Sequence, residues 1–536
     1  MFLTKHKAIL LTALSLLSAL ESRSQQPDWL VAWTVNWSLN PAYPQHRLAR
    51  GDNGQLYASR LVDARLNYGL DLFGSVALER IDPGTGQALW SCTLGDSAVM
   101  DALAVGDDGT LYAAGRFMGS LNMCAGPVMP NHGSGLDQGI SLLAIDMNGS
   151  LLWSMDLSIA HPDAEDIGAM AVDPSGGVWV ALENFGVADL VRFDGNGDET
   201  ESRTIDGSKL VGGMDFAPSG ALYVSGATGN GPFTFGGLSS NAPNPYNMYV
   251  LRYDAEGNGD WVAFASDITF QRPRVTCDPI GNAIVAGSVF ASTSFGNVQF
   301  HGPDWVYDLF VTKADSTGNF LWGKESAPAG GPITGDMSMG DGQALAADDA
   351  GNSYLIGNVR GEVDWGAGVI NSGQPISSYC LGLVSFDPSG APRWAITSQS
   401  ANGYIQAQAL TSDPGGEVHF IANADGTLDF PPLSAGATGQ QSAVLGRISA
   451  VPTAVGAENG DPLDLLEVAP NIGKGPFDLL VPKAIGPVRV RVLDTFGRIV
   501  MDGISGRTFG ADLAPGAYFV DVNWSAGHAI RRIVKQ

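Results

Sequence analysis

Residues 48–57 read Leu48-Ala49-Arg50-Gly51-Asp52-Asn53-Gly54-Gln55-Leu56-Tyr57, and this pattern recurs along the chain. It consists of a short apolar segment, a turn that ends in glycine, and a second segment with an aromatic residue. Glycine tolerates the positive φ that tight turns require, and aspartate accepts hydrogen bonds from the turn backbone. The pattern therefore predicts a β-hairpin.

Six further copies of this first hairpin follow at regular spacing. From Gly54 to Gly416 there are 362 residues over six intervals, a mean of about 60 residues per repeat. Internal repetition of one supersecondary unit is the sequence signature of a repeat architecture. The turns of the later copies lie at residues 107–109, 173–176, 217–220, 278–281, 348–351 and 413–416.

A second hairpin alternates with the first and runs from an aspartate through a glycine turn to a tryptophan. Its copies lead to Trp90, Trp153, Trp261, Trp322 and Trp394, and the copy at Phe193–Gly197 lacks the tryptophan. A seventh copy starts at Val444–Ile448 without a tryptophan strand, whereas the apolar residues 29–37 have no partner of their own. Joining these two halves makes seven four-stranded blades. We therefore predict a closed ring, completed in its last blade by the N-terminal strand, which removes exposed sheet edges.

Over about residues 28–450 this alternation resembles the seven-bladed β-propeller repeats of exported bacterial proteins. The resemblance implies that apolar first strands such as Ala102–Val105 and Ala169–Val172 line a central channel. It also implies that the tryptophans of the second hairpin are buried between blades. A 60-residue repeat leaves long loops on a rigid ring, and loops held by a rigid scaffold are where binding residues concentrate.

The chain changes character after residue 450. Residues 451–460 have the composition of a linker, and residues 461–536 contain short β-strand patterns separated by the turns Asp494–Gly497 and Leu513–Gly516. This segment predicts a small β-sandwich. The complete fold class is therefore all-β, a seven-bladed β-propeller followed by a small C-terminal β-sandwich.

Residues 461–536 also resemble the C-terminal sorting domain of type IX secretion cargo. The matching residues are Val490–Asp494 with Phe496–Arg498, then Leu513–Val520, and the basic tail that ends at Lys535; the start, Pro470-Asn471-Ile472, departs from the Pro-Asn-Pro usual in the family. The resemblance implies translocation across the outer membrane by the type IX machinery, removal of the domain, and release or surface attachment. It predicts Gly497 and Gly516 at positive-φ turn positions and Tyr518 in the small core.

The N-terminal residues 1–24 have the pattern of a signal peptide. Lys5 and Lys7 give a basic start, Ala8–Leu20 is apolar but too short to span a bilayer, and Ser22 and Ser24 are small residues placed for cleavage before Gln25. We find no other apolar stretch long enough for a transmembrane segment. The expected location is the outer cell surface or the medium, reached through the periplasm.

The charge is concentrated in the predicted propeller. The whole chain has a formal net charge of −26, and residues 26–460, with 17 basic and 46 acidic side chains, carry −29. Nucleic acid requires a positive footprint, so we expect no nucleic-acid partner. The low charged fraction of 16% and the 70 glycines fit β-structure with many turns rather than long surface helices.

No motif in the sequence names a catalytic residue. The seven histidines lack zinc-protease spacing, no Gly-x-Ser-x-Gly occurs, and the four cysteines are far apart, which leaves their disulfide pairing open. Ile81–Trp90 resembles the repeat of quinoprotein dehydrogenases, but the adjacent cysteines common in that family are missing. Asp194–Asp198 has alternating oxygen ligands, yet the bidentate glutamate of a calcium loop falls at Ile205, so we expect a hairpin turn. We therefore predict no cofactor and no metal.

Two function classes remain. The first is a secreted or surface-bound recognition or adhesion module that binds glycan or protein through its loops. The alternative is an extracellular hydrolase or lyase on the same ring, and we expect a binding protein rather than an enzyme. Carboxylates, histidine and aromatic residues gathered at one mouth of the ring favour the enzyme, whereas aromatic residues spread over loops favour binding. The sequence leaves the ligand open, as well as any activity.

Overall fold

The structure is a computed structural model of the 536-residue chain, and it divides into two compact units, residues 1–453 and 454–536. Each unit is described by itself. The predicted signal peptide, the predicted linker and Gly497 lie outside the described residues. The structure describes residues 25–37, 44–68, 71–123, 126, 128–132, 138–302, 308–326, 335–373, 379–399, 404–450, 467–469, 472–474, 476–480, 489–494, 498–504, 508–524 and 527–535.

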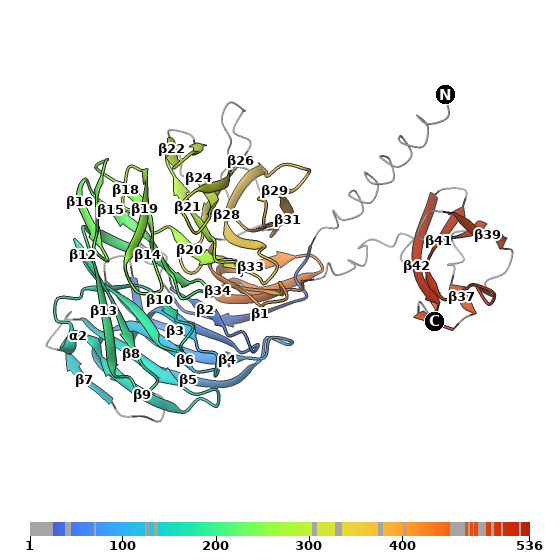
Figure 1. Cartoon of the computed structure of the whole chain (residues 1–536). Helices are drawn as coiled ribbons and strands as arrows, with labels where there is room; N and C mark the ends of the chain where they lie inside the picture. The colour runs from blue at the N-terminus through green and yellow to red at the C-terminus, as the bar shows by residue number, and fades with distance from the viewer. Residues whose placement is uncertain are drawn as a thin grey trace. The chain divides into compact units, whose positions relative to one another are not determined.

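Within its described residues the first unit contains seven four-stranded antiparallel blades around a central channel, which confirms the predicted propeller (Figure 1). Blades are numbered in chain order. Blade 1 contains β2 (Arg47–Arg50), β3 (Leu56–Tyr68), β4 (Asp71–Ile81) and the start of β5 (Ala88–Val105), and blade 2 contains the end of β5, β6 (Leu111–Asn122), β8 (Gln138–Ile145) and β9 (Leu151–Asp156). Blade 3 contains β10 (Asp166–Val172), β11 (Val178–Asn184), β12 (Val187–Phe193) and β13 (Glu199–Asp206), and blade 4 contains β14 (Ser208–Phe216), β15 (Leu222–Thr228), β18 (Asn247–Tyr253) and β19 (Gly259–Ser266). The long strand β5 takes part in two blades, since its start pairs with β4 and its end with β6.

In blade 6 two short strands share the innermost position, because residues 340–344 interrupt it. The last three blades consist of β20 (Arg274–Cys277), β21 (Ala283–Val289), β24 (Asp308–Ala314) and β25 (Phe320–Glu325); β26 (Gly335–Met339) with β27 (Leu345–Ala347), β28 (Ser353–Asp364), β30 (Cys380–Phe386) and β31 (Pro392–Thr397); β32 (Ile405–Ser412), β33 (Val418–Phe430), β34 (Leu433–Ile448) and β1 (Trp29–Thr34). Short additions are β7 (Val128–His132), β16 (Gly231–Phe235), β17 (Leu238–Ala242), β22 (Ser292–Phe295), β23 (Val298–His301), β29 (Ile370–Ser372) and the helix α2 (Leu157–Ala160).

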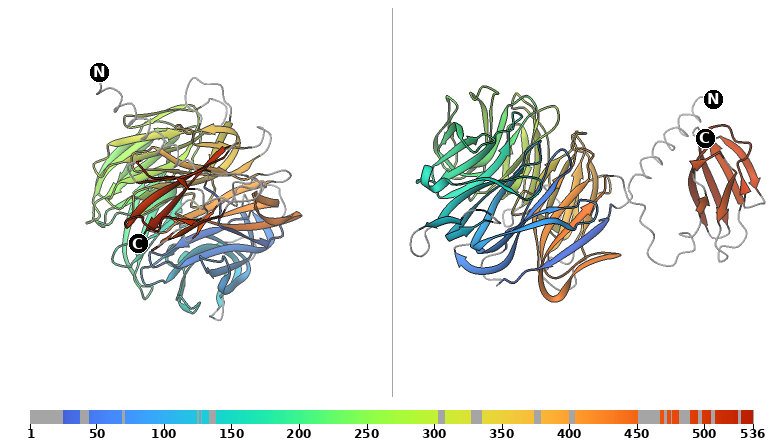
Figure 2. Two further views of the ribbon diagram at one scale, coloured as in Figure 1. Left: turned by 90° about the vertical axis from the view of Figure 1, so that its right-hand side faces the viewer. Right: turned by 90° about the horizontal axis from the view of Figure 1, so that it is seen from below.

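The N-terminal strand closes the ring as predicted. β1 pairs antiparallel with β34, with Trp29 opposite Arg447 and Thr34 opposite Ser442. Figures 1 and 2 show this blue strand beside the orange strands of blade 7. Ion pairs also join the last blade to the first, since Arg50 of β2 contacts Glu417 at 2.9 Å and Asp413 at 3.2 Å. The two ends of the propeller chain therefore stabilise one blade together.

The tryptophans of the second hairpin are half-buried, so the prediction that they are buried between blades is wrong in degree. Each lies on the outer strand of its blade and remains partly exposed. Trp90 donates Nε1–H to the Met147 carbonyl of the next blade at 3.0 Å, and its ring covers Gly149, which has a φ of +89°. A Cβ on Gly149 would come within 3.0 Å of that ring, so both backbone and packing require glycine there. The indoles of Trp153, Trp261 and Trp322 cover the next blade's turn in the same way.

Blade 3 lacks the tryptophan, and Arg203 takes its place. The guanidinium of Arg203 lies 4.5 Å from the ring centroid of Trp179, and a Cβ on Gly257 in the turn of blade 4 would come within 3.1 Å of it. An arginine plane stacked on aromatic rings replaces an indole at this seam. The missing tryptophan at the third second-hairpin copy is therefore a substitution and does not interrupt the ring.

The second unit is a small β-sandwich, as predicted. Its shared core contains Phe477, Val492 and Val520, among others, and Tyr518 is buried there with its hydroxyl donating to the Ala514 carbonyl at 2.9 Å. Gly516 has the predicted positive φ, +158°, where the chain enters one of the longest strands of this unit, and Gly510, at +80°, is a second positive-φ glycine of this unit. One sheet contains β35 (Glu467–Ala469), β37 (Phe477–Leu480) and β40 (Thr508–Phe509), and the other β36 (Ile472–Gly473), β42 (Gly527–Lys535), β41 (Gly516–Trp524), β38 (Arg489–Asp494) and β39 (Ile499–Ile504).

Candidate ligand-binding site at one mouth of the channel

The channel has two chemically different mouths. The turns of the first hairpin gather at one of them, which we call the turn mouth: the Asn53 amide of one turn donates to the Asp107 carbonyl of the next at 2.8 Å. The opposite end, which we call the loop mouth, is formed by the loops between blades and between the second and third strands of each blade. A cavity of about 1070 Å³ connects the two, and the predicted inner strands Ala102–Val105 and Ala169–Val172 line it.

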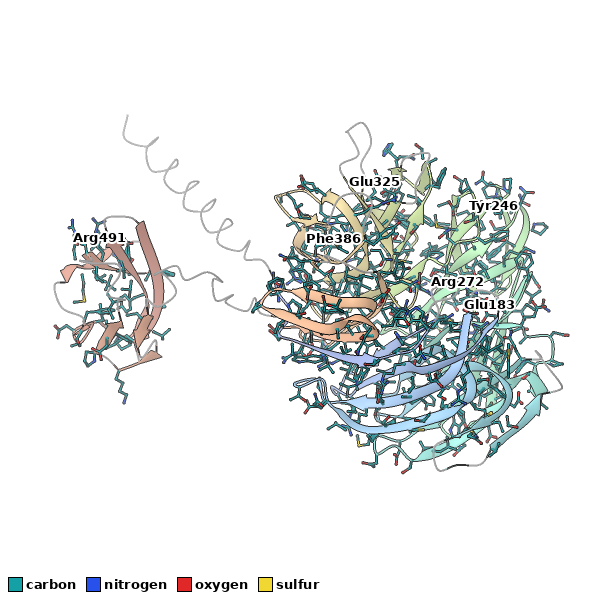
Figure 3. The ribbon with its side chains drawn as sticks, turned by 180° about the vertical axis from the view of Figure 1, so that it is seen from behind. Glu183, Tyr246, Arg272, Glu325, Phe386 and Arg491 are labelled. Carbon is teal, nitrogen blue, oxygen red and sulfur yellow. The ribbon has the colours of Figure 1, made fainter. Side chains whose placement is uncertain are left out.

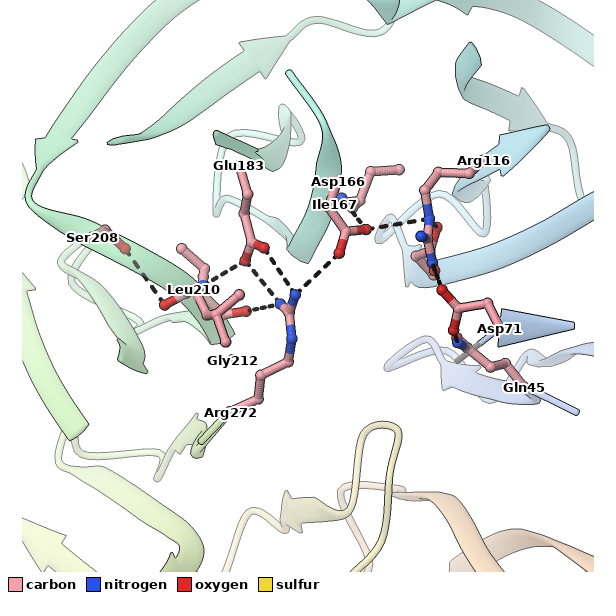
Figure 4. Close-up of polar contacts among 12 residues, drawn as sticks. Gln45, Asp71, Arg116, Asp166, Ile167, Glu183, Ser208, Leu210, Gly212 and Arg272 are labelled. Atoms are coloured by element: carbon pink, nitrogen blue, oxygen red, sulfur yellow. Dashed lines mark hydrogen bonds and ion pairs between the residues drawn. The ribbon is translucent and has the colours of Figure 1, made fainter. Parts of the chain in front are cut away.

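Side chains from three blades and from the segment before β20 form a charged network at the loop mouth (Figure 4). Arg116 of β6 contacts Asp101 at 2.8 Å, Asp71 at 2.9 Å and Asp166 at 3.2 Å. Arg272 contacts Asp166 at 3.1 Å and grips both Glu183 oxygens, at 2.8 and 2.9 Å. We define the charged network as Asp71, Asp101, Arg116, Asp166, Glu183 and Arg272.

The network holds carboxylates that burial disfavours. Burial raises the pKa of Asp166 and Glu183, although Arg116 and Arg272 act in the opposite direction. Burial also opposes the charge of Arg116, but the carboxylates of Asp101, Asp166 and Asp71 raise its pKa well above the usual value. Buried charges of this kind persist only when they are paired and hydrogen-bonded, so the network fixes the geometry of the mouth.

Two further arginines lie beside the network without a carboxylate partner among the described residues. Arg47 of β2 donates to the backbone carbonyls of Asp101 and His46 and to the Gln45 side chain. Arg274 of β20 donates to the backbone carbonyls of Gly212 and Asp341, and its Nε–H is buried without an acceptor. Both side chains line the cavity.

The interruption in blade 6 brings polar groups to the same place. Residues 340–344 leave the inner strand and bond to blade 7, where Gly342 donates its N–H to the Gln408 carbonyl at 2.7 Å. The exposed Asp341 accepts hydrogen bonds from the side chains of Gln406 and Gln408. The loop mouth thus combines guanidinium, carboxylate and amide groups around one cavity.

An aromatic patch lies at the rim of the same mouth. It consists of Phe185, Tyr246 and Phe270, from three different loops, with Lys209 and the exposed Ile268 beside them. Phe270 packs against Phe185 at a centroid distance of 5.7 Å and against Tyr246 at 4.9 Å, and both partners are exposed. Figure 3 marks Tyr246 together with Arg272 and Glu183 of the charged network. Phe270 and Arg272 are two residues apart, so one segment joins the patch to the network.

The turn mouth is acidic, and its carboxylates serve the turns. Asp278 accepts from the N–H of Asn282 at 2.8 Å and forms an ion pair with the buried Lys313 at 2.8 Å. Partial burial of its carboxyl group raises the pKa of Asp52, and the nearby charges of Asp107 and Asp349 raise it further. These groups explain the shape of the hairpins and leave the loop mouth as the candidate site.

The sequence named no site residues, and the structure shows why. Arg116, Glu183 and Arg272 lie outside the repeated turns, and they meet only through the closed ring. The sequence held one signal that could have pointed to these site residues: arginine and glutamate stand in apolar or loop segments of a chain that has few charged residues. Asp194 accepts from the N–H groups of Asn196 and Asp198 at 2.8 and 3.0 Å and forms a hairpin turn. Within the described residues no cluster of metal-ligating side chains occurs.

Three of the four cysteines lie within the described residues. Cys92 is disulfide-bonded, Cys277 and Cys380 take no part in a disulfide, and Cys124 lies outside the described residues. In the part of the chain that the structure describes, we find no helix with the length and apolar character needed to span a bilayer.

Comparisons with known proteins give distant structural likenesses. No protein-family model matches the chain, and no curated protein sequence matches it. A protein from Lactobacillus plantarum aligns at 15% identity and a TM-score of 0.38, covering 69% of this chain and 96% of its own. The PQQ-bound form of aldose sugar dehydrogenase from Streptomyces coelicolor aligns at 12% and 0.29, covering 62% and 93%. A gluconolactonase from Xanthomonas campestris aligns at 11% and 0.29, covering 76% and 99%. Alignments with these values transfer no activity to this chain.

Proposed function

We propose that the protein is an exported recognition module whose loop mouth binds an extracellular glycan or protein. One observation carries this proposal: the exposed aromatic patch and the charged network lie on the same mouth, joined by residues 267–274. Aromatic faces supply contact area for a ligand, and a few placed polar groups orient it. Such a combination of rim and cavity suits a ligand that lies across the mouth with one end in the channel.

The state of the carboxylates in the charged network favours recognition over hydrolysis. A hydrolase requires a carboxyl group that is available to give a proton to a bound substrate or take one from it. In the charged network Asp71, Asp101, Asp166 and Glu183 each contact a guanidinium. The two histidines whose pKa burial lowers to about 3, His46 and His419, are fully buried away from water.

The export route belongs to the same proposal. We assign residues 1–24 to a signal peptide, 28–450 to the exported propeller, 451–460 to a linker and 461–536 to a type IX sorting domain. The disulfide at Cys92 supports an oxidising compartment, and the net charge of −29 over residues 26–460 suits an extracellular protein. Lys535, part of the resemblance to the sorting domain, is buried and donates to the Gly510 and Ala511 carbonyls.

Binding is tested with the full mature chain on glycan and protein arrays, beside a panel of hydrolase substrates. We expect a ligand on one array, no turnover, and loss of binding in the triple variant Phe185→Ser, Tyr246→Ser, Phe270→Ser. The matched control is Leu89→Ser with Leu152→Ser, which removes exposed apolar side chains from outer strands. Turnover of a substrate, or binding that survives the triple variant, would contradict the proposal.

Export is tested in the native bacterium by deleting residues 461–536. We expect a folded propeller to remain in the periplasm, because β1 and β34 close the ring without the second unit. Fusing the same residues behind a reporter with a signal peptide should carry the reporter to the surface or the medium. Normal export of the truncated protein would overturn the sorting assignment.

A further inference from the structure

Arg47 and Arg274 are the arginines of the loop mouth whose guanidinium groups form no direct ion pair among the described residues, although the charge of Asp341 acts on both. Arg116 and Arg272 each contact at least two carboxylates, whereas Arg47 and Arg274 form no ion pair among the described residues. Arg274 is only 8% exposed and donates solely to backbone carbonyls. A buried guanidinium normally has an anionic partner, so this arrangement is incomplete.

The hydrogen-bond inventory of the two arginines has room for a ligand. A guanidinium carries five N–H groups, so two arginines carry ten. Three contacts from Arg47 and two from Arg274 are accounted for, which leaves about five donors facing the cavity or buried without an acceptor. Burial, together with the charges of Arg47 and Arg272, lowers the pKa of Arg274 to about 9. A bound anion would relieve both the unmet donors and the repulsion.

The surroundings select the kind of anion. Residues 26–460 carry a net charge of −29, and Asp341 is exposed in the same cavity, so a polyanion would be repelled. A single carboxylate matches the planar fork of arginine, as the bidentate contact between Arg272 and Glu183 in the same mouth illustrates.

The aromatic patch indicates what carries the carboxylate. Phe270 and Arg274 are four residues apart, so their Cα atoms are separated by at most about 14 Å. A short oligosaccharide spans such a distance, with ring faces on Phe185, Tyr246 and Phe270 and one substituent in the channel. We propose that the loop mouth binds an acidic saccharide, whose carboxylate enters the channel between Arg47 and Arg274. This inference rests on the proposed recognition function and adds the ligand class to it.

The test measures binding of carboxylated oligosaccharides to the full mature chain by isothermal titration calorimetry. The probes are otherwise neutral oligosaccharides that end in a single galacturonate, mannuronate or glucuronate residue and a sialylated trisaccharide, each beside its methyl ester, with inorganic phosphate as a separate arm. We expect at least one acid to bind 10-fold or more tightly than its ester, and phosphate to bind no more tightly than the esters. Arg47→Met should weaken that acid 10- to 100-fold and leave the ester unchanged.

Two variants guard the result against misfolding. Arg47→Lys keeps the charge but loses the fork, so we expect a smaller loss than for Arg47→Met. Arg252→Met is the control, because Arg252 is a half-buried arginine of β18, away from the channel, that pairs with Asp260 on the neighbouring strand. Equal affinity for acid and ester, or an acid affinity that Arg47→Met leaves unchanged, overturns the inference while the recognition function stands. Absence of any saccharide binding, with a protein ligand found on the array, also overturns it and leaves the recognition function in place.

Discussion

The two mouths of the channel are built from the same seven inner strands but follow different rules. At the turn mouth the chain repeats one hairpin, and the aspartate that opens a turn bonds to that turn, as Asp348 does to the N–H of Asn352 at 2.8 Å. At the loop mouth no segment repeats, and Arg116 gathers carboxylates from three blades. The comparison teaches that the repeat builds the frame, whereas departures from the repeat build the site.

The sharpest test of this comparison removes one charge at each mouth. Asp278→Asn leaves the buried Lys313 without its partner at the turn mouth, and Glu183→Gln weakens the grip on Arg272 at the loop mouth. We expect Asp278→Asn to cost about 3–5 kcal/mol of unfolding free energy, and Glu183→Gln about 2 kcal/mol because Asp166 still pairs with Arg272. Chemical denaturation gives the stability, and calorimetry gives the affinity for the array ligand. Only Glu183→Gln should weaken binding; a binding loss in Asp278→Asn alone would reverse the roles of the mouths.

A second test concerns the seams between blades. Trp322→Ala removes the indole that covers Gly390 and donates to the Pro388 carbonyl. We expect a loss of about 3 kcal/mol, at the low end for tryptophan because the ring is half-buried, with unchanged ligand affinity. Leu321→Ala, at its exposed neighbour, is the control and should cost well under 1 kcal/mol. Trp322 would be a binding residue if the variant lost affinity and kept its stability.

The pattern of hairpins made most of the fold predictable, and it could not reveal the site. Turn residues such as Asp278 and Gly281 act locally, so seven hairpins and the split blade are visible in the sequence. Asp101 and Arg272 are 171 residues apart in the sequence, yet both belong to the charged network. They come together only because the blades close into a ring. Phe185, Tyr246 and Phe270 likewise come from three loops with no shared motif. The half-buried state of Trp90 depended on the ring perimeter, which sequence spacing does not encode.

A third, smaller effect is a pH dependence of stability at the junction of blades 7 and 1, where His419 of β33 contacts Arg50 of β2. Burial and then the charge of Arg50 lower the pKa of His419 from 6.5 to about 3. The unfolded chain binds a proton below pH 6.5 that the folded chain excludes down to about pH 3, so stability falls as pH falls through this window. We expect His419 to account for about 1 kcal/mol of lost stability at pH 5.5 relative to pH 7.5. In urea titrations the unfolding free energy of the variant His419→Gln should fall by about 1 kcal/mol less over this pH range than that of the unaltered protein. An equal fall in both proteins would contradict the assignment.

The smallest effect is expected at the acidic rim of the turn mouth. Asp107→Asn removes one of the charges that, after burial, raise the pKa of Asp52. We expect a stability change within about 0.5 kcal/mol, favourable at low salt and smaller at high salt because exposed charges are screened. Ligand affinity should not change. A marked loss of binding in this variant would place part of the site at the turn mouth.

Hydrogen exchange measured by mass spectrometry, with and without the array ligand, tests most directly that the loop mouth is the binding face. Amides of residues 267–274 and 340–344 reach the loop mouth, whereas those of residues 107–109 and 278–281 belong to the turn mouth. Bound ligand should slow exchange in the first two segments and leave the last two unchanged. Protection confined to the turn-mouth segments, with none in residues 267–274, would contradict the account.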